Sequence, residues 1–483
     1  MSASQAERRE FDPRLPLHFL VFHANTMRPL LQLLRALAGL AWLGWAAGAG
    51  ALEPSGKQVL GWHPWWMGTT YERYDYTKLD TIAYFSYEVN ATNGNPLSLH
   101  DWSTTPLVAW AHSNHVQVVL TATLFGEAPN QLLLGNPASC SNLIHQLTVA
   151  VSNRGADGVN IDFELLGSSS RAPLTAFMSN LTARFRRDLP GAVVSIDLPA
   201  VDWNNAFDAG ALDGFLDQQI IMGYDLHWST APQAGPVAPL RASATWGPYS
   251  VERAVDDYLA LGVQPQRLLL GCPHYGYDWP VISSNLPAAT TGEGTEIHYS
   301  AAKAAAATHG RRWDSASSSP YYTYRSGGVT HQAWYDDAES LGLKYDMVKA
   351  KGIGGIAIWA LGFDDPLPEL WELIGQKFAT PAWDQGYADL GGGWRRLAWF
   401  GDYIPMGGEG WIWHNRHGFF FVAANSVPTS VWLYTMDMGW LWTGDGIYPY
   451  LFRSTDSAWL WYNGSTQPRW FLNMQTMQWE HRP

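Results

Sequence analysis

The sequence predicts a (β/α)8 barrel with a short α+β insertion after its seventh strand, followed by a small all-β repeat module. Two patterns carry this prediction. Between residues 55 and 378, short β-rich apolar runs alternate with stretches of helical spacing, and eight strand–helix units make such a barrel. After residue 378, tryptophans recur with a period of two, which is typical of β-strands. The eight predicted strands are 59–63, 81–87, 118–123, 158–164, 193–198, 219–224, 268–272 and 355–359.

Helical spacing is clear between the fourth and fifth predicted strands. Apolar residues recur there at intervals of three and four, as on the buried face of an amphipathic helix: Leu174, Phe177, Met178, Leu181 and Phe185. In barrels of this type the catalytic groups lie at the C-terminal ends of the strands. We therefore expect the functional residues at those ends, where the polar candidates of this sequence fall.

Two changes of composition mark the boundaries within and after the barrel. Residues 280–330 interrupt the seventh unit, are rich in Ser, Thr, Gly and Ala, and are expected to form the insertion. Residues 379–393 contain Pro381 and end in three glycines, which predicts a linker. The barrel is thus expected over residues 55–378 and the β module over 394–483.

The tryptophans of the module alternate along short segments separated by polar turns, which predicts hairpins in a degenerate repeat. Because so small a repeat has few other large apolar residues, we expect most of these rings to build its core. Their density exceeds what such a core can hide, so the remainder are expected to be exposed and to stack on sugar rings or cell-surface polymers.

The first fifty residues have the three-part layout of a secretory signal peptide. Residues 27–51 carry basic residues, then an apolar segment over 36–47, then the small residues Ala49, Gly50 and Ala51. Residues 1–26 resemble no such segment and are interpreted as a gene-model extension. The alternative is an uncleaved membrane anchor, although the apolar segment is short for a membrane span. Either way, we expect a protein that is secreted or held at the cell surface.

Composition narrows the class of partner. Charged residues make up only 15% of the chain, aromatic residues 14%, and 27 residues are Trp, which suits carbohydrate handling. The net charge of −13 and the lack of any basic run argue against a nucleic-acid partner. Cys140 and Cys272 cannot form a disulfide scaffold; free core thiols are favoured, and a single pairing stays open. We expect a monomer.

The chemistry centres on the strand 158–164. Alternate strand residues point the same way, so one face of this strand is apolar and the other carries Asn160, Asp162 and Glu164. Burying such a row costs several kcal/mol unless the charges are paired or protonated. Neighbouring carboxylates that perturb each other's protonation are what glycosidic acid catalysis needs. A strand end that is polar for no functional reason is the weaker interpretation.

This stretch resembles the active-site strand of glycoside hydrolase family 18, which comprises chitinases and related N-acetylglucosaminidases. The family pattern Asp-x-x-Asp-x-Asp-x-Glu maps onto Asp157, Asn160, Asp162 and Glu164. The departure is Asn160, where the best-known members have Asp, and it affects the usual charge relay through the strand. The form Gly-Val-Asn-Ile-Asp-Phe-Glu is similar to the branch that includes bacterial spore and cell-wall glucosaminidases.

Further matches to this family lie at other strand ends. Residues 222–225, Met-Gly-Tyr-Asp, resemble the family motif Met-x-Tyr-Asp, and strand eight ends in Trp359, where the family places an aromatic floor under the sugar. The segments 235–240 and 275–279 resemble family loops, and the insertion would wall one side of the substrate groove. The resemblance covers about residues 57–378.

The resemblance implies a role for each matched residue. Glu164 would be the general acid, and Asp162 would hold the acetamido N–H of the substrate and offset developing positive charge. Tyr224 would orient the acetamido carbonyl oxygen, which attacks in place of a protein nucleophile. Asp225 would contact sugar hydroxyls, and Trp359 would stack on the ring. Further substrate-binding candidates are Asn160, Trp62, Trp279 and Asp157, although for Asp157 an ordering role at the loop and strand start is favoured.

The resemblance predicts a glycosidase that cuts β-1,4 bonds next to N-acetylglucosamine in chitin, chito-oligosaccharides or peptidoglycan glycan strands. A second hypothesis is a non-catalytic lectin of the chitinase-like kind; such proteins typically lose the acid, whereas Glu164 is present. We predict no metal and no cofactor, because the closely spaced His414 and His417 lack an acidic or thiol partner and no Gly-rich phosphate loop follows a strand.

Overall fold

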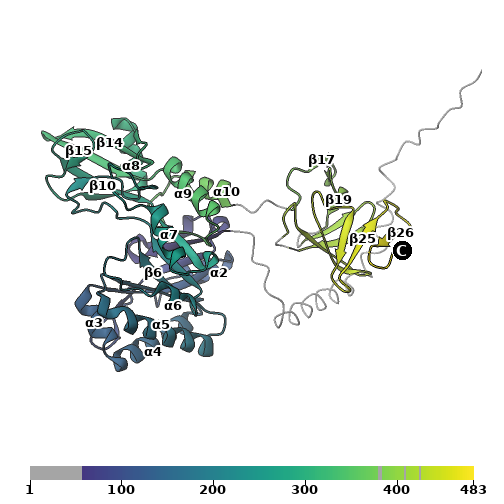
Figure 1. The fold of residues 1–483 in the computed structure, drawn as a ribbon, viewed down its shortest axis with the longest axis horizontal. Helices are drawn as coiled ribbons and strands as arrows, with labels where there is room; N and C mark the ends of the chain where they lie inside the picture. Colours follow the sequence, from purple (N-terminus) through teal and green to yellow (C-terminus); the bar gives the residue numbers. More distant parts are fainter. Residues whose placement is uncertain (1–56, 379–382, 407–409, 424–425) are drawn as a thin grey trace, which may run out of the picture. The chain divides into compact units, whose positions relative to one another are not determined.

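The computed structural model describes residues 57–378, 383–406, 410–423 and 426–483 (Figure 1). The predicted gene-model extension, 1–26, and the predicted signal peptide, 27–51, lie outside the described residues. Among the helices that are described, none has the length and apolar character needed to cross a bilayer.

The predicted barrel is confirmed. Its strands pair in parallel in the order β1-β16-β9-β7-β6-β5-β4-β2, and β1 also pairs with β2, so the sheet closes. The short β3 (Pro96–Ser98) adds to β2 in antiparallel fashion. The barrel strands are β1 (Gln58–Pro64), β2 (Thr81–Val89), β4 (Gln117–Phe125), β5 (Gly158–Glu164), β6 (Val193–Pro199), β7 (Gln218–Met222), β9 (Leu268–Pro273) and β16 (Gly355–Trp359).

Helices connect these strands. The α-helices are α2 (Leu107–Ser113), α3 (Glu127–Leu134), α4 (Pro137–Arg154), α5 (Arg171–Asp188), α6 (Ala209–Asp213), α7 (Val251–Ala260), α9 (Ala338–Ala350) and α10 (Glu369–Phe378). Short 3-10 helices span Trp65–Arg73, Tyr76–Lys78, Ser168–Ser170 and Pro265–Arg267. Helix α4 leads into β5, and the residues at its two ends explain where the helix begins and ends. Asn136 caps its first turn, and Gly155 ends it in the left-handed conformation, at φ 61°.

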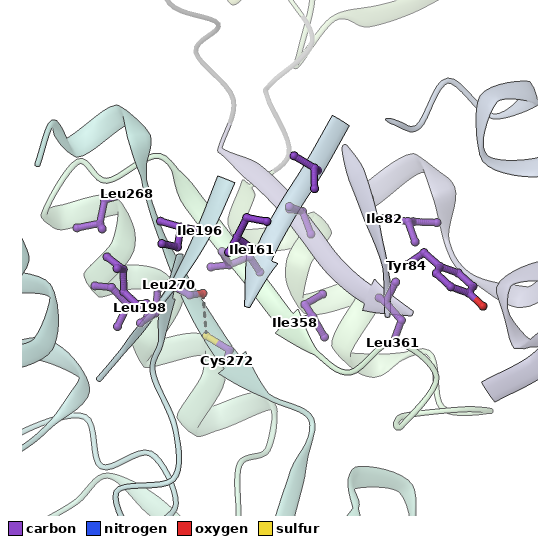
Figure 2. Close-up of a cluster of buried hydrophobic side chains, with 14 of the residues drawn as sticks. Ile82, Tyr84, Ile161, Ile196, Leu198, Leu268, Leu270, Cys272, Ile358 and Leu361 are labelled. Carbon is purple, nitrogen blue, oxygen red and sulfur yellow. Dashed lines mark hydrogen bonds between the residues drawn. The ribbon is translucent and has the colours of Figure 1, made fainter. Parts of the chain in front are cut away.

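The main core lies between the outer face of the barrel and the helices (Figure 2). Ile161 and Phe163 of β5 belong to it, and the ring of Phe163 stacks on Phe177 of α5 with centroids 5.7 Å apart. The apolar face predicted for α5 is buried there. Cys272 lies in the same core and Cys140 is half-buried; both thiols are free. The opposite face of β5 is thereby directed into the barrel.

The insertion is an antiparallel sheet of order β12-β10-β15-β14-β13 with one helix. It begins at β10, one residue after β9, and so extends beyond the predicted 280–330. The prediction missed its first strand because Tyr275–Val281 resembles a barrel loop in sequence. Its elements are β10 (Tyr275–Val281), β12 (Thr295–His298), α8 (Tyr299–His309), β13 (Arg312–Asp314), β14 (Ser319–Ser326) and β15 (Val329–Tyr335), and β8 (Gln233–Ala234) pairs separately with β11 (Ala288–Ala289).

The C-terminal residues form one antiparallel sheet in which each strand pairs with the next in sequence. The first strand, Ala388–Gly391, lies within the predicted linker. The three glycines at the end of that linker, residues 391–393, make the turn into the next strand, each with φ between 61° and 86°. The strands are β17 (Ala388–Gly391), β18 (Trp394–Leu397), β19 (Gly401–Pro405), β20 (Trp411–His414), β21 (Gly418–Val422), β22 (Val431–Thr435), β23 (Gly439–Thr443), β24 (Tyr450–Arg453), β25 (Ala458–Tyr462), β26 (Arg469–Asn473) and β27 (Gln478–Arg482).

The expectation that most tryptophans of this sheet build its core is wrong. Leu441 and Leu460 are fully buried, whereas the flanking Trp440, Trp442 and Trp459 are half-buried or exposed. The period of two puts the rings on one face and the smaller apolar residues on the other. The core therefore consists mainly of Leu, Phe, Val, Ile and Tyr, and the strand tryptophans form an outer layer.

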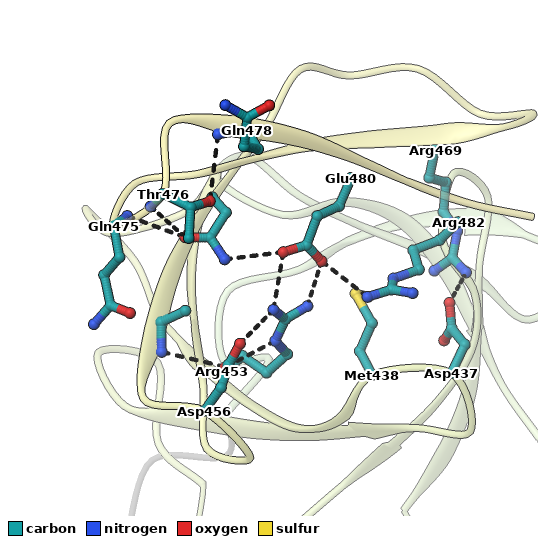
Figure 3. A network of polar contacts seen from close by, with 12 residues as sticks. Asp437, Met438, Arg453, Asp456, Arg469, Gln475, Thr476, Gln478, Glu480 and Arg482 are labelled. Carbon is teal, nitrogen blue, oxygen red and sulfur yellow. Dashed lines mark hydrogen bonds and ion pairs between the residues drawn. The ribbon is translucent and has the colours of Figure 1, made fainter.

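A polar network also holds this sheet together (Figure 3). The guanidinium of Arg453, 6% exposed, donates to Glu480 at 2.6 Å and to Asp456 at 2.5 Å, and thereby links β24 to β27. Asn473 and Arg482 also donate to Glu480. These donors hold the pKa of Glu480 at about 2, chiefly through the hydrogen bond from Arg453.

Candidate active site

A cavity of about 330 Å³ opens at the C-terminal ends of the barrel strands. Strands from opposite sides of the barrel contribute to it, and the insertion supplies one wall. Its lining residues are Trp62, Phe85, Phe125, Asp162, Glu164, Asp197, Met222, Tyr224, Asp225, Tyr275, Tyr277, Glu296 and Trp359. Six of the residues proposed from the sequence are among them, and they come from four different strands or strand ends.

Asp162 and Glu164 lie on the inner face of β5, next to β4, where Thr123 and Phe125 are their register partners. Asp162 is 5% exposed, while Glu164 is half-buried at the last position of the strand. The chain then turns sharply, because Leu165 adopts φ 57°. This places the Glu164 carboxyl at the mouth of the barrel and the Asp162 carboxyl one layer deeper.

Burial raises the pKa of Glu164 to about 7, and the neighbouring charge of Asp225 adds to the effect. A glutamic acid in this environment keeps its proton near neutral pH and can donate it. The pKa of Asp162 is raised well above its usual value by burial and by the charges of Glu164 and Asp197. The site therefore combines a proton donor at its mouth with a deeper carboxyl group that does not ionise freely.

Tyr224 and Asp225 follow β7 and face this pair across the cavity. Asp225 has φ 56°, a left-handed conformation that Asp tolerates better than most residues. Its Oδ1 accepts a hydrogen bond of 2.5 Å from the hydroxyl of Tyr275. Burial raises the pKa of Asp225 to about 6, although hydrogen bonds from Tyr275 and Tyr277 counteract it. A carboxylate acceptor thus lies beside a buried phenol.

Aromatic rings form another side of the cavity. The rings of Trp359 and Trp62 lie 6.0 Å apart at 60°, and Phe85 meets Trp359 edge-on at 4.8 Å. Trp66, which is 49% exposed, continues the row: the centroid of its ring lies 6.0 Å from that of Phe85. Flat apolar surfaces beside carboxyl groups suit a ligand that has both hydroxyl groups and an apolar face, such as a sugar ring.

Asn160 lies beneath the cavity. Its Nδ2 donates to Asp197 at 2.9 Å and to Ser195 at 3.1 Å, and its Oδ1 accepts from Trp62 at 3.1 Å and from Thr121 at 3.2 Å. The amide therefore links four barrel strands. The proposal that Asn160 contacts substrate directly is not supported, because its side chain is fully buried and fully engaged.

Two other substrate-binding candidates lie away from the cavity. Asp157 precedes β5 and accepts hydrogen bonds of 2.7 Å from Val118 N and His112 Nε2. It is seven residues before Glu164, about 20 Å along an extended strand, so it lies at the opposite end of the barrel. Trp279 is fully buried in the insertion, where its Nε1 donates to Ser229 O at 3.1 Å. Neither residue is among those that line the cavity.

The sequence analysis missed Asp197 and Glu296. Asp197 could have been found by the reasoning that identified Asp162, because it is a charged residue inside an apolar parallel strand. Glu296 projects from β12 of the insertion, and no local pattern connects that strand to the barrel. His414 and His417 instead lie in the core of the C-terminal sheet, where Phe400 O and the Tyr448 hydroxyl are their partners.

The chain is similar to known glycosidases. The family model of the glycosyl hydrolases of family 18 matches residues 64–364. The di-N-acetylchitobiase of Rattus norvegicus is 26% identical over 319 residues, which cover 60% of this chain and 78% of the relative. The cortical fragment-lytic enzyme of Bacillus anthracis is 25% identical over 315 residues, which cover 62% and 68%.

Solved structures agree on the fold. The crystal structure of the Bacillus cereus spore cortex-lytic enzyme SleL superposes with a TM-score of 0.56 at 22% identity, covering 67% of this chain and 74% of that one. The family match includes the barrel strands from β2 to β16, which, with the residues at their ends, carry all the cavity residues of the barrel except Trp62 of β1. This chain therefore belongs to the glycosyl hydrolases of family 18.

Proposed function

We propose that the protein hydrolyses β-1,4 bonds next to N-acetylglucosamine by substrate-assisted retaining catalysis. The observation that carries this proposal is the placement of Asp162 and Glu164 on one inward face of β5, across a cavity from Tyr224. In glycosidases whose own second carboxylate attacks the sugar, two carboxyl groups flank the bond; members of this family are exceptions that use the substrate.

Glu164 acts first as an acid. Its proton passes to the glycosidic oxygen as the bond to the anomeric carbon breaks, so the leaving sugar departs as an alcohol. The pKa of about 7 keeps the proton available below neutral pH. In the second step the Glu164 carboxylate takes a proton from water and becomes the acid again. The water oxygen bonds to the anomeric carbon as the bond from that carbon to the acetamido oxygen breaks.

The substrate's acetamido oxygen is the nucleophile. It bonds to the anomeric carbon and forms an oxazolinium ion, whose positive charge lies over the acetamido group. Asp162 accepts the hydrogen bond of the acetamido N–H, and the negative charge of the buried carboxyl groups at this point offsets that of the ion. The Tyr224 hydroxyl orients the acetamido oxygen, Asp225 binds sugar hydroxyls, and Trp359 stacks on the ring.

We propose two classes of substrate. The relatives named for chitobiose cleavage point to chito-oligosaccharides, and those named for cortex lysis point to peptidoglycan glycan strands. Both polymers present β-1,4 bonds next to N-acetylglucosamine. We propose that the protein acts outside the cytoplasm, in line with the signal peptide predicted over residues 27–51, and that it uses no metal or cofactor.

The outer aromatic layer of the C-terminal sheet favours a second, binding function for that sheet. Trp459, Trp470 and Trp479 are 36–49% exposed, and the rings of Trp470 and Trp479 lie 6.4 Å apart. Exposed aromatic rings in neighbouring strands suit stacking on successive sugars of a polysaccharide. We propose that this surface retains the enzyme on insoluble substrate.

The test is turnover by the purified protein on chito-oligosaccharides and on peptidoglycan, measured as reducing ends, beside Glu164→Gln. The wild type is expected to release products from at least one substrate. Glu164→Gln keeps the shape of the side chain but has no transferable proton, so turnover should fall by at least about 10³-fold while sugar binding persists. Comparable turnover by this variant would contradict the role of Glu164, and binding without turnover by the wild type would favour a lectin.

A further inference from the structure

We propose that Asp197 is a positioning residue for this reaction, and that from β6 it supplies the buried negative charge that the family pattern places at position 160. The inference rests on the proposed function, because it concerns the same acid and the same intermediate. Asp197 is 2% exposed and lines the cavity together with Asp162 and Glu164. The family pattern on β5 does not include Asp197, because that residue lies on the neighbouring strand, β6.

The contacts of Asn160 identify Asp197 as its acidic partner. An amide has two N–H donors and one oxygen with two lone pairs, and Asn160 uses all of them. Because it is an amide, Asn160 neither carries a negative charge nor takes up a proton. What it does is donate to Asp197 Oδ1 at 2.9 Å, and a donor of this kind stabilises the ionised carboxylate.

Asp162 is the second acidic group of this arrangement. Strands β5 and β6 pair in parallel with Ile161 opposite Ile196, so Asp162 and Asp197 are the next residues on the two strands. Oδ1 of Asp162 is buried and has no hydrogen-bond partner among the described residues. Two adjacent carboxyl groups that are both buried do not both ionise near neutral pH.

The surroundings decide which of the two keeps the proton. Burial raises the pKa of both, and the charge of Asp197 raises that of Asp162 further. The hydrogen bond from Asn160 lowers the pKa of Asp197, whereas no such donor reaches Asp162 Oδ1 in the described part of the chain. We therefore assign the charge to Asp197 and the proton to Asp162 in the resting enzyme.

A fixed charge at this position has two consequences. The charge of Glu164 raises the pKa of Asp197, and because such an interaction is mutual, a charge on Asp197 favours the proton on Glu164. The Asp162–Asp197 pair also keeps one negative charge for its one proton, and that charge offsets the positive oxazolinium ion that Asp162 holds. The other titratable groups that line the cavity are Tyr224, Asp225, Tyr275, Tyr277 and Glu296, and the lining includes no cationic side chain that could cancel the charge.

A purely structural role explains the arrangement less well. Asp197 could be retained only as a hydrogen-bond acceptor for Asn160, but a neutral Asn or Ser would accept the same bond. Burying a carboxylate without a cation costs several kcal/mol, which a structural acceptor has no need to incur. The charge itself is therefore the property that distinguishes Asp197.

The experiment compares the pH dependence of kcat/KM for the wild type, Asp197→Asn and the exchanged double variant Asn160→Asp/Asp197→Asn, on whichever substrate the wild type cleaves. Asn at 197 can still accept the bond from Asn160. We expect kcat of Asp197→Asn to fall on the order of 10- to 100-fold with KM changed less than about threefold. The fall of its kcat/KM at high pH, the alkaline limb of the pH profile, should move to lower pH by at least about 0.5 unit, because Glu164 loses its proton more readily.

The double variant returns one carboxylate to the strand of the family motif and should recover at least about tenfold in kcat and most of the shift in the limb. Ser195→Ala is the matched control: it removes the other acceptor of Asn160 but no charge, so the limb should stay in place. The melting temperature of each variant is measured as well, so that a loss of stability is not mistaken for a loss of positioning.

Two results would overturn the inference. One is an Asp197→Asn variant with the wild-type limb, whatever its turnover, because a structural role predicts a loss of activity at an unchanged limb. The other is a double variant that folds and is no more active than Asp197→Asn. Failure of the proposed function would look different: the wild type itself would release no product.

Discussion

At the scale of single residues, the acid chemistry of this site depends on where Glu164 lies on its strand. It is the last residue of β5, half-buried, with Asp225 across the cavity and no cation among the lining residues. Burial and like charge both favour its protonated form. The next residue, Leu165, is exposed. Because Glu164 lies where the strand ends, its carboxyl group borders both the cavity and the solvent.

The pH profile should follow from this. Only protonated Glu164 can donate, so kcat/KM is expected to fall as pH rises through about 7, the pKa of Glu164 in the free enzyme. Asp225→Asn removes a charge that raises this pKa, and its alkaline limb should lie at lower pH. The measurement is kcat/KM on a chito-oligosaccharide from pH 4 to 9. A rate that stays constant from pH 6 to 9 would contradict the assignment.

Asp162→Asn and Tyr224→Phe should each lower kcat on the order of 10²-fold, because both variants position the acetamido group less well. Steady-state kinetics on the same oligosaccharide measure this. Tyr258→Phe is the matched control, since its hydroxyl is also buried but donates to Pro199 O at 2.8 Å, away from the cavity lining. An equal loss in all three variants would point to damaged folding instead of lost positioning.

The sequence predicted six of the thirteen residues that line the cavity, for a reason visible at this scale. Glu164, Asp162 and Tyr224 are charged or polar groups at apolar strand ends, and such positions are costly without a function. Asp197 carried the same signal and was overlooked, because it lies outside the recognised motif. Trp279 was misplaced because a tryptophan in a loop-like segment gives no sign of whether it faces a ligand or a core.

At the scale of elements, the barrel strands were predictable and the insertion was only partly so. Alternation of strands and helices is local information, whereas the pairing of β10 with β12 and β15 brings together residues up to 59 positions apart, such as Gly276 and Tyr335. The insertion contributes Tyr275, Tyr277 and Glu296 to the cavity wall, and no periodicity shows which of its faces would turn inward.

The C-terminal sheet gives a similar lesson. The period of two was visible in the sequence, but it does not state which of the two faces is buried. The expectation favoured the larger rings, yet the smaller side chains pack inside. With Leu, Phe and Val at the alternate positions, the inner face already has enough apolar residues for a close-packed core.

The Arg453–Glu480 pair should stabilise this sheet at neutral pH. Glu480 has a folded-state pKa of about 2, below that of an unfolded glutamate, so its contribution is present above about pH 4.5 and is lost as pH falls toward 2. Glu480→Gln should lower the free energy of unfolding by about 1–3 kcal/mol at pH 7 and flatten its dependence on pH in that window.

Thermal or urea unfolding of the full chain, followed at pH 7 and pH 3, measures this effect. Asp445→Asn is the control, because that carboxylate lies in an exposed turn of the same sheet. If Glu480→Gln and the wild type show the same difference between the two pH values, the ion pair does not carry the stability assigned to it.

At the scale of the whole molecule, we expect cleavage and retention on substrate to reside in different parts of the chain. Residues 57–378 contain the cavity and its core, and the C-terminal sheet has a core cluster of its own. Removing residues 379–483 is therefore expected to leave the cleavage of short soluble oligosaccharides within about twofold of the full chain, and to weaken binding to insoluble polysaccharide.

The measurements are kcat/KM on a soluble oligosaccharide and the fraction of protein bound to insoluble chitin or peptidoglycan. The full-length variant Trp459→Ala/Trp470→Ala/Trp479→Ala should lose retention in the same way, whereas Met436→Ala, also exposed, should not. Loss of activity on the soluble substrate after truncation would show that the C-terminal residues are a structural part of the barrel.

The central claim is that the substrate's own acetamido group forms the intermediate in the cavity between Asp162 and Tyr224. The most direct measurement is inhibition by a thiazoline analogue of the oxazolinium ion, together with turnover on an oligosaccharide that lacks the 2-acetamido group. We predict competitive inhibition by the analogue and turnover reduced by at least about 10³-fold without the acetamido group, because the nucleophile is then missing. Indifference to the analogue, with both oligosaccharides cleaved at equal rates, would contradict the account.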